Sequence, residues 1–247
     1  MHVVAVLAAG GQGARLGTAV PKQFLELAGR SLLERSVSAL LASPRIRQVV
    51  VALPAEYLND LPPYLRDPRV SVVAGGPRRQ DSVANAAGAV SADAEVVLIH
   101  DAARPFVDLA TIERVIEAAA TAGAAIAALP ARDTVKLAHV TETSWVGTEF
   151  GDPLPAVRPK SVPAVKRTLP RETIFLAQTP QGFRRDVLER VLALGATGAE
   201  GTDEAALAEQ AGCTVLLVPG DPCNIKITTA ADLAFARGLL LERGELS

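Results

Sequence analysis

The sequence predicts a three-layer α/β fold whose central sheet is doubly wound and mainly parallel. Short apolar runs rich in β-branched residues recur along the chain, and most are separated by stretches with the period of an α-helix. The run Val96–Ile99 is apolar without alternation, which is typical of a strand covered on both faces. Sheets of this kind bind ligands at the carboxyl ends of their strands, so a functional site is expected in the loops that follow the strands.

The expected strands follow one another in chain order, with one clear helix between the first two. Strands are predicted at Val3–Leu7, Val49–Leu53, Val70–Ala74, Val96–His100, Ala124–Leu129 and Thr214–Val218. Thr173–Ala177 is a further short run with strand character. The helix is predicted over Ser31–Leu41, where leucines and Val37 share one face while Glu34 and Arg35 lie elsewhere. We expect that apolar face to pack into the core.

Composition narrows the classes of protein to which the chain can belong. Of its 247 residues, 49% are hydrophobic and 21% are charged, and the net charge is -2. These values favour one domain over residues 1–247 and argue against a nucleic-acid partner, which would require a concentrated basic face. Cys213 and Cys223 form neither a C-x-x-C pair nor a Cys/His cluster, which is typical of a reducing compartment. No signal-peptide pattern or bilayer-spanning apolar stretch is found, so we expect a cytoplasmic location and no membrane partner.

A glycine-rich segment directly after the first expected strand is the strongest indication of a ligand site. It extends from Ala9 to Gly17, and Pro21-Lys22-Gln23 follows shortly after. Glycines let backbone N–H groups approach phosphate oxygens, while Arg15 and Lys22 add positive charge. Together these features predict a nucleoside triphosphate site. The alternative is a turn that serves only tight packing of a strand against a helix.

Two familiar phosphate-binding motifs do not fit this segment. A P-loop requires Lys-Ser/Thr after its last glycine, but Ala14-Arg15 follows Gly13. A dinucleotide fingerprint requires the spacing G-x-G-x-x-G, whereas Gly11, Gly13 and Gly17 are spaced G-x-G-x-x-x-G. The segment is therefore expected to bind phosphate in another way.

Charged residues also follow the expected strand Val96–His100. A carboxylate, Asp101, comes directly after the strand, and Arg104 lies three residues further on. Asp101 is a candidate to hold a magnesium ion against phosphate oxygens, because Mg²⁺ prefers hard oxygen ligands. Its alternative role is to cap the turn that follows. Arg104 is expected either to pair with Asp101 or to contact an anionic ligand.

The segment Gly75–Val83 closes another strand and opens a helix. Asp81 or Ser82 is expected to act as the N-cap of that helix. The hydroxyl and the free N–H groups of a helix start are equally suited to a ribose or to the edge of a base.

Further cations lie in strand-end loops near the C-terminus. Lys226 belongs to Asn224-Ile225-Lys226, between an expected strand and an expected helix. An ammonium group is a compact point charge for a phosphate oxygen, whereas a guanidinium such as that of Arg171 suits bidentate recognition. Gln178-Thr179-Pro180-Gln181 adds a hydroxyl after the short run Thr173–Ala177. The ordinary alternative for each cation is a solvated surface position.

One long segment, from Lys136 to about Ile174, interrupts the alternation of strands and helices. It is rich in proline and lacks helical periodicity, and such long connections are uncommon in compact domains. It is either a disordered surface loop or an extended arm that pairs with another subunit. The apolar side chains of Val140, Trp145, Val146, Phe150 and Val157 favour the arm. We therefore expect a homodimer.

Taken in order along the chain, these motifs resemble those of the 2-C-methyl-D-erythritol 4-phosphate cytidylyltransferases, within the wider nucleotidyltransferase family. The matching elements are Gly11-x-Gly13-x-Arg15 with Pro21-Lys22-Gln23, Gly75-Gly76 through Arg79-x-Asp81-Ser82-Val83, His100–Pro105, Arg132-Asp133-Thr134, Thr179-Pro180-Gln181, Thr202-Asp203-Glu204 and Asn224-Ile225-Lys226. Each element alone is weak, but their common order from residue 3 to about residue 240 is specific. The resemblance implies a Rossmann-like nucleotidyltransferase fold with a protruding β-arm for dimerisation.

The resemblance also implies a reaction and a set of site residues. CTP and 2-C-methyl-D-erythritol 4-phosphate would give the cytidine diphosphate derivative and pyrophosphate with a divalent cation such as Mg²⁺. Arg15 and Lys22 would stabilise the transition state, and Arg171 and Lys226 would position the attacking phosphate. The remaining substrate-binding positions are Arg104, Thr134 and Thr179 for the acceptor, and Ala9, Gly10, Gly11, Gly76, Ser82 and Asp101 for cytidine. Arg171 and Thr134 would serve the neighbouring subunit's site.

Several alternatives stay open at this point. Aligned on Arg15, the chain has Ala8-Ala9-Gly10-Gly11 where the family has Pro-Ala-Ala-Gly, so either Ala9 or Gly10 faces the base. Cys223 stands where an aspartate is common. The acceptor could be another one, such as ribitol 5-phosphate or a sugar 1-phosphate. A non-catalytic nucleotide-binding protein is the remaining hypothesis, although such a protein would not require Lys22 and Lys226.

Overall fold

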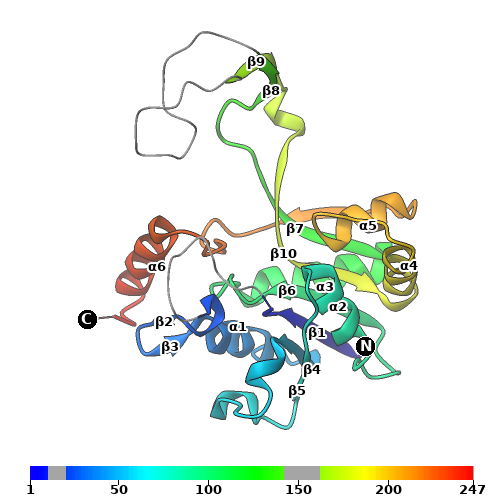
Figure 1. The fold of residues 1–247 in the computed structure, drawn as a ribbon, viewed down its shortest axis with the longest axis vertical. Coiled ribbons are helices and arrows are strands. Elements are labelled where there is room, and N and C mark those ends of the chain that lie inside the picture. The colour runs from blue at the N-terminus through cyan, green and yellow to red at the C-terminus, as the bar shows by residue number, and fades with distance from the viewer. Residues whose placement is uncertain (11–20, 142–161, 247) are drawn as a thin grey trace. The chain divides into compact units, whose positions relative to one another are not determined.

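The computed structural model describes residues 1–10, 21–141 and 162–246 (Figure 1). The chain divides into two compact units. The first, which we name the sheet unit, contains Met1–Leu129 and Ala177–Ser247, and the second, the arm unit, contains Pro130–Leu176. Among the described residues, no helix combines the length and the apolar character needed to cross a bilayer.

The sheet unit is built around a seven-stranded sheet with the strand order β11-β7-β10-β6-β1-β4-β5. The strands are β1 (Val3–Ala8), β4 (Ile46–Leu53), β5 (Val70–Ala74), β6 (Val96–Asp101), β7 (Ala124–Pro130), β10 (Phe175–Arg184) and β11 (Leu216–Pro219). β1 pairs in parallel with β4 and β6, and β5 pairs in parallel with β4. β11 is also parallel to β7, whereas β10 is antiparallel to β6. The predicted, mainly parallel sheet is confirmed.

Helices cover both faces of this sheet, as Figure 1 shows. They are α1 (Leu32–Leu41), α2 (Arg79–Ala87), α3 (Leu109–Ala122), α4 (Arg185–Ala196) and α5 (Glu204–Gln210). Along β1, Val3, Ala5 and Leu7 pack with side chains of α1 and α3. The alternate residues Val4 and Val6 belong to a second core with side chains of α2, α4 and α5. Because successive strand residues face opposite sides, one apolar strand supplies both cores, and the predicted three-layer fold is confirmed.

A third, smaller core fixes the segments that carry Lys22 and Lys226. It includes the buried side chains of Leu27, Phe106, Ile227 and Leu240. Leu27 belongs to the short hairpin β2 (Glu26–Leu27) and β3 (Arg30–Ser31), which follows the 3-10 helix η2 (Lys22–Phe24). Leu240 lies on α6 (Ala230–Glu242). Ile227 is the neighbour of Lys226, and its burial anchors that loop.

The first helix matches its prediction except at one residue. Ser31 is the N-cap and accepts a hydrogen bond from Glu34 N at 3.0 Å. Arg35, expected away from the core face, is only 6% exposed. Its guanidinium donates to the Leu27 carbonyl and pairs with Glu245, so hydrogen bonds and an ion pair compensate for its burial.

The second helix begins earlier than expected. Its N-cap is Arg78, whereas Asp81 occupies the N3 position and accepts a hydrogen bond from Arg78 N at 3.1 Å. The expectation that Asp81 or Ser82 is the N-cap is therefore wrong. The carboxylate of Asp81 still acts at the helix start, because from N3 it satisfies the backbone N–H of the capping residue.

The strand β10 is much longer than the run Thr173–Ala177 that was expected to form a strand. Arg171–Thr173 form the 3-10 helix η5, and β10 continues from Phe175 to Arg184. Phe183 is fully buried, and a Cβ atom on Gly182 would lie 2.8 Å from Val115 and 2.9 Å from Ala119 of α3. Close packing against α3 thus explains the glycine inside this strand.

The arm unit contains a two-stranded antiparallel sheet. Its strands are β8 (Lys136–Thr141) and β9 (Val162–Thr168). Val140 is 73% exposed and Val165 is 61% exposed. The other apolar residues that favoured a dimerisation arm, Trp145, Val146, Phe150 and Val157, lie outside the described residues. An arm is therefore present as a separate unit, while its role in dimerisation stays a prediction.

Candidate active site

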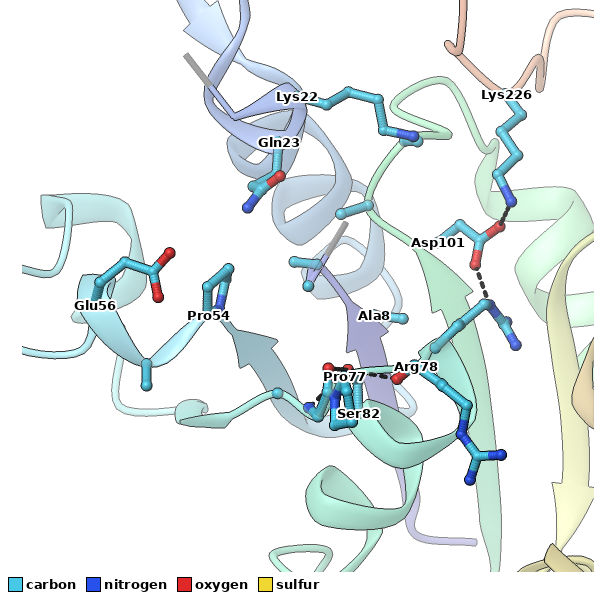
Figure 2. Close-up of a pocket in the computed structure, with 18 residues that line it drawn as sticks. Ala8, Lys22, Gln23, Pro54, Glu56, Pro77, Arg78, Ser82, Asp101 and Lys226 are labelled. Atoms are coloured by element: carbon cyan, nitrogen blue, oxygen red, sulfur yellow. Dashed lines mark hydrogen bonds and ion pairs between the residues drawn. The ribbon is translucent and has the colours of Figure 1, made fainter. Parts of the chain in front are cut away.

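A cavity of about 590 Å³ lies at the carboxyl ends of β1, β4, β5 and β6 in the sheet unit (Figure 2). Its lining residues are Ala8–Gly10, Lys22, Gln23, Pro54–Glu56, Gly75–Arg79, Ser82, Asp101–Ala103 and Lys226. This is the position at which parallel α/β sheets bind their ligands. The volume falls within the range of small-molecule sites in proteins.

One wall of the cavity consists of backbone rather than large side chains, and we name it the glycine wall: Gly10, Gly75, Gly76 and Ser82. A Cβ atom on Gly76 would overlap the Cβ of Asp81 and lie 3.0 Å from the Asp81 carbonyl carbon. Cβ atoms on Gly10 and Gly75 would lie 3.0 and 3.1 Å from the Ser82 Oγ. Only glycine leaves room here, so the backbone itself is presented to a ligand.

Ser82 holds the glycine wall together. It is 2% exposed, and its Oγ accepts a hydrogen bond from Gly76 N at 3.0 Å. The single hydroxyl proton is directed at the carbonyls of Gly76 and Arg78, at 3.3 and 3.2 Å. The hydroxyl therefore fixes the conformation of Gly76 relative to the start of α2.

The opposite wall is charged, and we name it the charged wall: Arg79, Asp101 and Lys226. Asp101 ends β6 and is 6% exposed. Its Oδ1 accepts from Arg79 Nε at 2.8 Å, and its Oδ2 contacts Lys226 Nζ at 2.7 Å. Figure 2 shows the contact between Asp101 and Lys226 as a dashed line. Each carboxylate oxygen thus holds a different cation.

These contacts determine the protonation state of Asp101. Burial alone would raise the pKa of its carboxyl, but the charges and hydrogen bonds of Arg79 and Lys226 outweigh that effect and lower the pKa well below its ordinary value. Asp101 is therefore an anion throughout the physiological range. It cannot donate a proton to a ligand, and it acts as an electrostatic anchor.

Arg79 extends the charged wall into the interior. Its Nη1 donates to Glu204 Oε2 at 2.5 Å, and Glu204 is 1% exposed. Burial alone would lower the pKa of Arg79, but the charges and hydrogen bonds of Asp101 and Glu204 raise it by more, so the net shift is upward. For Glu204, burial raises the pKa of the carboxyl more than Arg79 lowers it, so the net shift is upward. The Arg79 guanidinium thus lies between two carboxylates, those of Asp101 and Glu204.

A neutral hydrogen-bond chain supports Asp101 from behind. Asp101 N donates to Thr179 Oγ1 at 3.1 Å, and this hydroxyl lies 2.9 Å from His100 Nδ1. His100 Nε2 lies 3.0 Å from the Arg104 carbonyl, which can only accept. His100 Nε2 is therefore the protonated nitrogen, and the Thr179 hydroxyl donates to Nδ1. Burial lowers the pKa of His100 to about 4, so the ring is neutral near pH 7.

The loop that carries Lys226 is fixed by polar side chains of β10 and by Arg104. Gln178 Nε2 donates to the carbonyls of Asp221 and Asn224, and Asn224 Nδ2 donates to the Thr179 carbonyl at 2.8 Å. Arg104 Nη1 donates to the Asn224 carbonyl at 2.7 Å. Arg104 was expected to pair with Asp101 or to contact an anionic ligand, but its guanidinium is directed at the carbonyls of Asn224 and Ala177.

The predicted site residues fall into three groups. Those that line the cavity are Ala9, Gly10, Lys22, Gly76, Ser82, Asp101 and Lys226. Arg104 and Thr179 lie behind the charged wall in the networks just described. Thr134 is an exposed loop residue of the arm unit, and Arg171, in η5 of the same unit, donates to the Arg132 carbonyl at 2.9 Å. Gly11 and Arg15 lie outside the described residues.

Sequence reasoning missed several cavity residues. Gln23 was quoted only as part of a motif, yet it is 3% exposed and lines the cavity. Pro54–Glu56 line it as well, and their place directly after β4 was the signal that could have identified them. Glu204, which lies outside the cavity, was likewise quoted only within a motif, and its link to Arg79 could not be foreseen because it joins positions 125 residues apart.

The contacts of Asp101 do not favour a magnesium site centred on this residue. Both Asp101 oxygens already contact cations, so Mg²⁺ bound there would add a further positive charge beside Arg79 and Lys226. Among the residues that the structure describes, no group of three or more His, Cys, Asp or Glu side chains could hold a metal ion. Asp101 is also not a cap for the following turn, since its carboxylate is directed at Arg79 and Lys226.

The sequence is similar over most of its length to a family of known proteins. The family model described as IspD: 2-C-methyl-D-erythritol 4-phosphate cytidylyltransferase matches residues 3–149 and 151–242. A curated 2-C-methyl-D-erythritol 4-phosphate cytidylyltransferase of Acidobacterium capsulatum is 39% identical over 254 residues, which cover 98% of this chain and 99% of the relative.

Similarity extends to bifunctional proteins and to solved structures. A "Bifunctional enzyme IspD/IspF" of Anaeromyxobacter dehalogenans is 48% identical over 242 residues, covering 97% of this chain. The chain spans only 57% of the length of that relative and of a second bifunctional one. The crystal structure of 2-C-methyl-D-erythritol 4-phosphate cytidylyltransferase from Thermus thermophilus has a TM-score of 0.73 and 35% identity, covering 97% of this chain and 98% of that one. This chain belongs to the 2-C-methyl-D-erythritol 4-phosphate cytidylyltransferase family.

Proposed function

We propose that this protein transfers the cytidylyl group of CTP to 2-C-methyl-D-erythritol 4-phosphate, in non-mevalonate isoprenoid biosynthesis. The products are 4-diphosphocytidyl-2-C-methyl-D-erythritol and pyrophosphate. The observation that carries the proposal is a cavity with a glycine wall on one side and, on the other, Lys226 held by Asp101. Backbone groups suit a nucleotide that must be approached closely, and a fixed ammonium suits a phosphate oxygen. Family membership supports the same assignment.

The reaction needs positioning and charge more than covalent help. A phosphate oxygen of the acceptor attacks the α-phosphorus of CTP, and the bond from that phosphorus to the bridging oxygen of pyrophosphate breaks in line. Negative charge builds on the oxygens around the α-phosphorus and on the leaving group. Fixed cations that meet this charge lower the barrier, because they need no reorganisation during the reaction.

The roles proposed for individual residues follow from this charge distribution. Arg15 and Lys22 act at the α-phosphate and the leaving group, whereas Arg171 and Lys226 hold the attacking phosphate. Arg104, Thr134 and Thr179 belong to the acceptor side. Arg104 and Thr179 contact backbone groups of Asn224 and Asp101, so they affect acceptor binding indirectly. The cytidine side consists of Ala9, Gly10, Gly11, Gly76, Ser82 and Asp101. The cavity-lining positions of Lys22 and Lys226 support this division.

We propose Mg²⁺ as the divalent cofactor, bound to phosphate oxygens of the nucleotide. The occupied oxygens of Asp101 favour this arrangement over a dedicated protein site. Chelation of the metal should then abolish turnover without lowering the unfolding temperature of the protein in the absence of nucleotide.

We also propose a cytoplasmic homodimer with a shared active site. Residues 1–247 act as one nucleotidyltransferase domain whose arm, at about residues 136–174, pairs with another subunit and places Arg171 and Thr134 at the partner's cavity. The exposed apolar side chains of Val140 and Val165 support an arm that is covered by a partner.

A pyrophosphate-release assay with a panel of acceptors tests the reaction. Purified protein with Mg²⁺ and CTP should release pyrophosphate only when 2-C-methyl-D-erythritol 4-phosphate is present. Equal or faster release with ribitol 5-phosphate or a sugar 1-phosphate would replace the proposed acceptor. Nucleotide binding without release in any arm would favour a non-catalytic nucleotide-binding protein.

Mixed dimers test the shared site. Arg15→Ala protein and Arg171→Ala protein should each be nearly inactive, and after subunit exchange the heterodimer should regain one working site. Mixing each variant with itself is the matched control. No recovery in exchanged heterodimers would overturn the shared site while leaving the acceptor assignment to the panel assay.

A further inference from the structure

We infer that Glu204, a buried residue outside the cavity, is a positioning residue that fixes Lys226 through Arg79 and Asp101. The consequence for turnover rests on the proposed function. The contacts themselves form a continuous series of alternating charges. Glu204 holds Arg79 at 2.5 Å, Arg79 holds Asp101 at 2.8 Å, and Asp101 holds Lys226 at 2.7 Å. We name this series the ion chain.

The burial of Glu204 is difficult to explain by stability alone. The residue is 1% exposed, and its Oε1 has no hydrogen-bond partner among the residues that the structure describes. Its charge is compensated at Arg79, through Oε2. A buried ion pair is often no more stabilising than apolar side chains of similar volume, because both charges must leave water. Net stability therefore does not explain a glutamate at this position. We infer that its role is to set the orientation of the Arg79 guanidinium.

Both ends of the ion chain are fixed by side chains of the same strand, β10. Gln181 Nε2 donates to Asp203 Oδ2 at 2.7 Å and its Oε1 accepts from Ala205 N, which holds the first turn of α5 where Glu204 lies. Three residues earlier, Gln178 holds the backbone of the loop that carries Lys226. The end residues Glu204 and Lys226 are thus set by one rigid element.

The guanidinium of Arg79 links the position of Glu204 to that of Asp101, because it is planar and is held by both carboxylates. Its Nη1 donates to Glu204 while its Nε donates to Asp101. Without Glu204, the bond to Asp101 would be the one remaining side-chain contact of this guanidinium within the described parts of the chain, and the guanidinium could rotate about it. The direction of the Asp101 carboxylate, and with it the position of the Lys226 ammonium, would then be less well defined.

The first test replaces Glu204 by leucine, which keeps a similar volume, and by glutamine, whose Oε1 can still accept from Arg79. We expect Glu204→Leu to lower kcat by about 10- to 100-fold with little change in the KM for CTP, since small misplacements of a reacting group have effects of this size. Glu204→Gln should keep kcat within about fivefold of wild type because the hydrogen bond to Arg79 is retained. Glu209→Leu, on the exposed side of the same helix, is the matched control.

Should Glu204→Leu fail to fold, Glu204→Asp serves in its place. Aspartate keeps the charge but is one methylene too short to reach Arg79, so its kcat should also fall. Wild-type kcat in a folded Glu204→Leu or Glu204→Asp protein would overturn the inference.

A double variant separates positioning from general damage. If Glu204 acts through Lys226, Lys226→Ala combined with Glu204→Leu should be no slower than Lys226→Ala alone. If Glu204 acts independently, the two fold-reductions should multiply. Multiplication would overturn the inference.

A readout that does not need turnover keeps this inference distinct from the proposed reaction. Brief acetylation with acetic anhydride, mapped by mass spectrometry, reports how well the Lys226 ammonium is held, with exposed Lys166 as internal reference. Acetylation of Lys226 should increase in Glu204→Leu and not in Glu204→Gln or Glu209→Leu. Absence of turnover in wild type would contradict the proposed function alone. Unchanged acetylation in a folded Glu204→Leu protein would contradict the ion chain.

Discussion

The two walls of the cavity are held in place by different interactions. The glycine wall has no charge, and its shape is set by the absence of side chains at Gly10, Gly75 and Gly76 and by the Ser82 hydroxyl. The charged wall is set by ions, with Asp101 between Arg79 and Lys226. The glycine wall is fixed by short-range sterics, whereas each residue of the charged wall depends on the next.

This difference predicts different sensitivities to substitution. A change in the glycine wall acts locally, through overlap or a lost hydrogen bond, and should affect mainly nucleotide binding. A change in the charged wall removes compensation from buried neighbours and should affect both turnover and folding. Substitutions in each wall can therefore sharpen or break the comparison.

The largest effect is expected for Asp101→Asn. The asparagine amide keeps one acceptor but directs an NH₂ group at the second cation, so Arg79 or Lys226 loses its partner. We expect kcat to fall about 1000-fold, the upper range for loss of one electrostatic contribution, and the free energy of unfolding to fall by about 3 kcal/mol. Pyrophosphate release and urea unfolding measure the two effects.

Asp67→Asn is the control for that substitution. Asp67 also pairs with an arginine, Arg69 at 3.4 Å, but this pair lies on the surface outside the cavity. It should leave turnover unchanged and alter stability little, as is usual for exposed ion pairs. An Asp101→Asn protein as stable and active as the Asp67→Asn protein would remove the distinction between the two walls.

The second effect concerns His100, behind the charged wall. Because burial lowers its folded-state pKa to about 4, against about 6.5 when unfolded, the unfolded chain binds a proton between these values and the folded protein does not. Stability conferred by the neutral ring is thus complete above about pH 6.5 and is lost as the pH falls towards 4. The loss from this one group amounts to roughly 3 kcal/mol.

Urea unfolding from pH 7 to pH 4 in wild type and in His100→Gln measures this contribution. Glutamine can donate to the Arg104 carbonyl but does not titrate, so its free energy of unfolding should fall less steeply over the same interval. Parallel pH profiles for the two proteins would show that His100 does not support the charged wall in its neutral form.

The sequence predicted the glycine wall better than the charged one. Gly10 and Gly76 follow apolar strands directly, and a glycine after a strand has a local meaning that one sequence can reveal. Asp101 and Lys226 were also identified from their places after strands. The ion pairs of Asp101 with Arg79 and Lys226 were not predicted. Arg79 was quoted only within a motif, and the expected partner of Asp101 was Arg104. Ion pairs depend on tertiary distances, which have no local pattern.

The strand β10 shows the same limit at the level of the fold. Strand character was expected only for Thr173–Ala177, and the Pro180 and Gly182 that follow are unusual inside a strand. The extension of β10 to Arg184 depends on pairing with β6 and on packing of Gly182 beneath α3. Strands such as β1 and β6, by contrast, were predicted closely because their apolar runs are buried between two layers of helices.

The third prediction tests the glycine wall by adding one methyl group. In Gly76→Ala the new Cβ would overlap Asp81, whose backbone belongs to α2 and cannot move independently. We expect kcat/KM for CTP to fall about 100-fold, since displacement of the binding backbone by a fraction of an ångström is enough for such losses. Gly238→Ala, at a helical position with nothing within 4 Å, is the matched control and should behave as wild type. Equal kcat/KM values of the two variants would mean that the backbone of the glycine wall can shift to accommodate a Cβ atom without loss of CTP binding.

The smallest effect is expected for Ser82→Ala, which leaves every backbone atom of the glycine wall in place and removes only the hydroxyl that holds Gly76 N at 3.0 Å. A single neutral hydrogen bond contributes about 1 kcal/mol, so the KM for CTP should rise by roughly fivefold to tenfold while kcat changes little. Ser38→Ala, on the exposed face of α1, controls for loss of a serine hydroxyl outside the cavity. If instead kcat falls and the KM is unchanged, Ser82 acts on the reacting groups, and the glycine wall shares the electrostatic task that the comparison assigns to the charged wall.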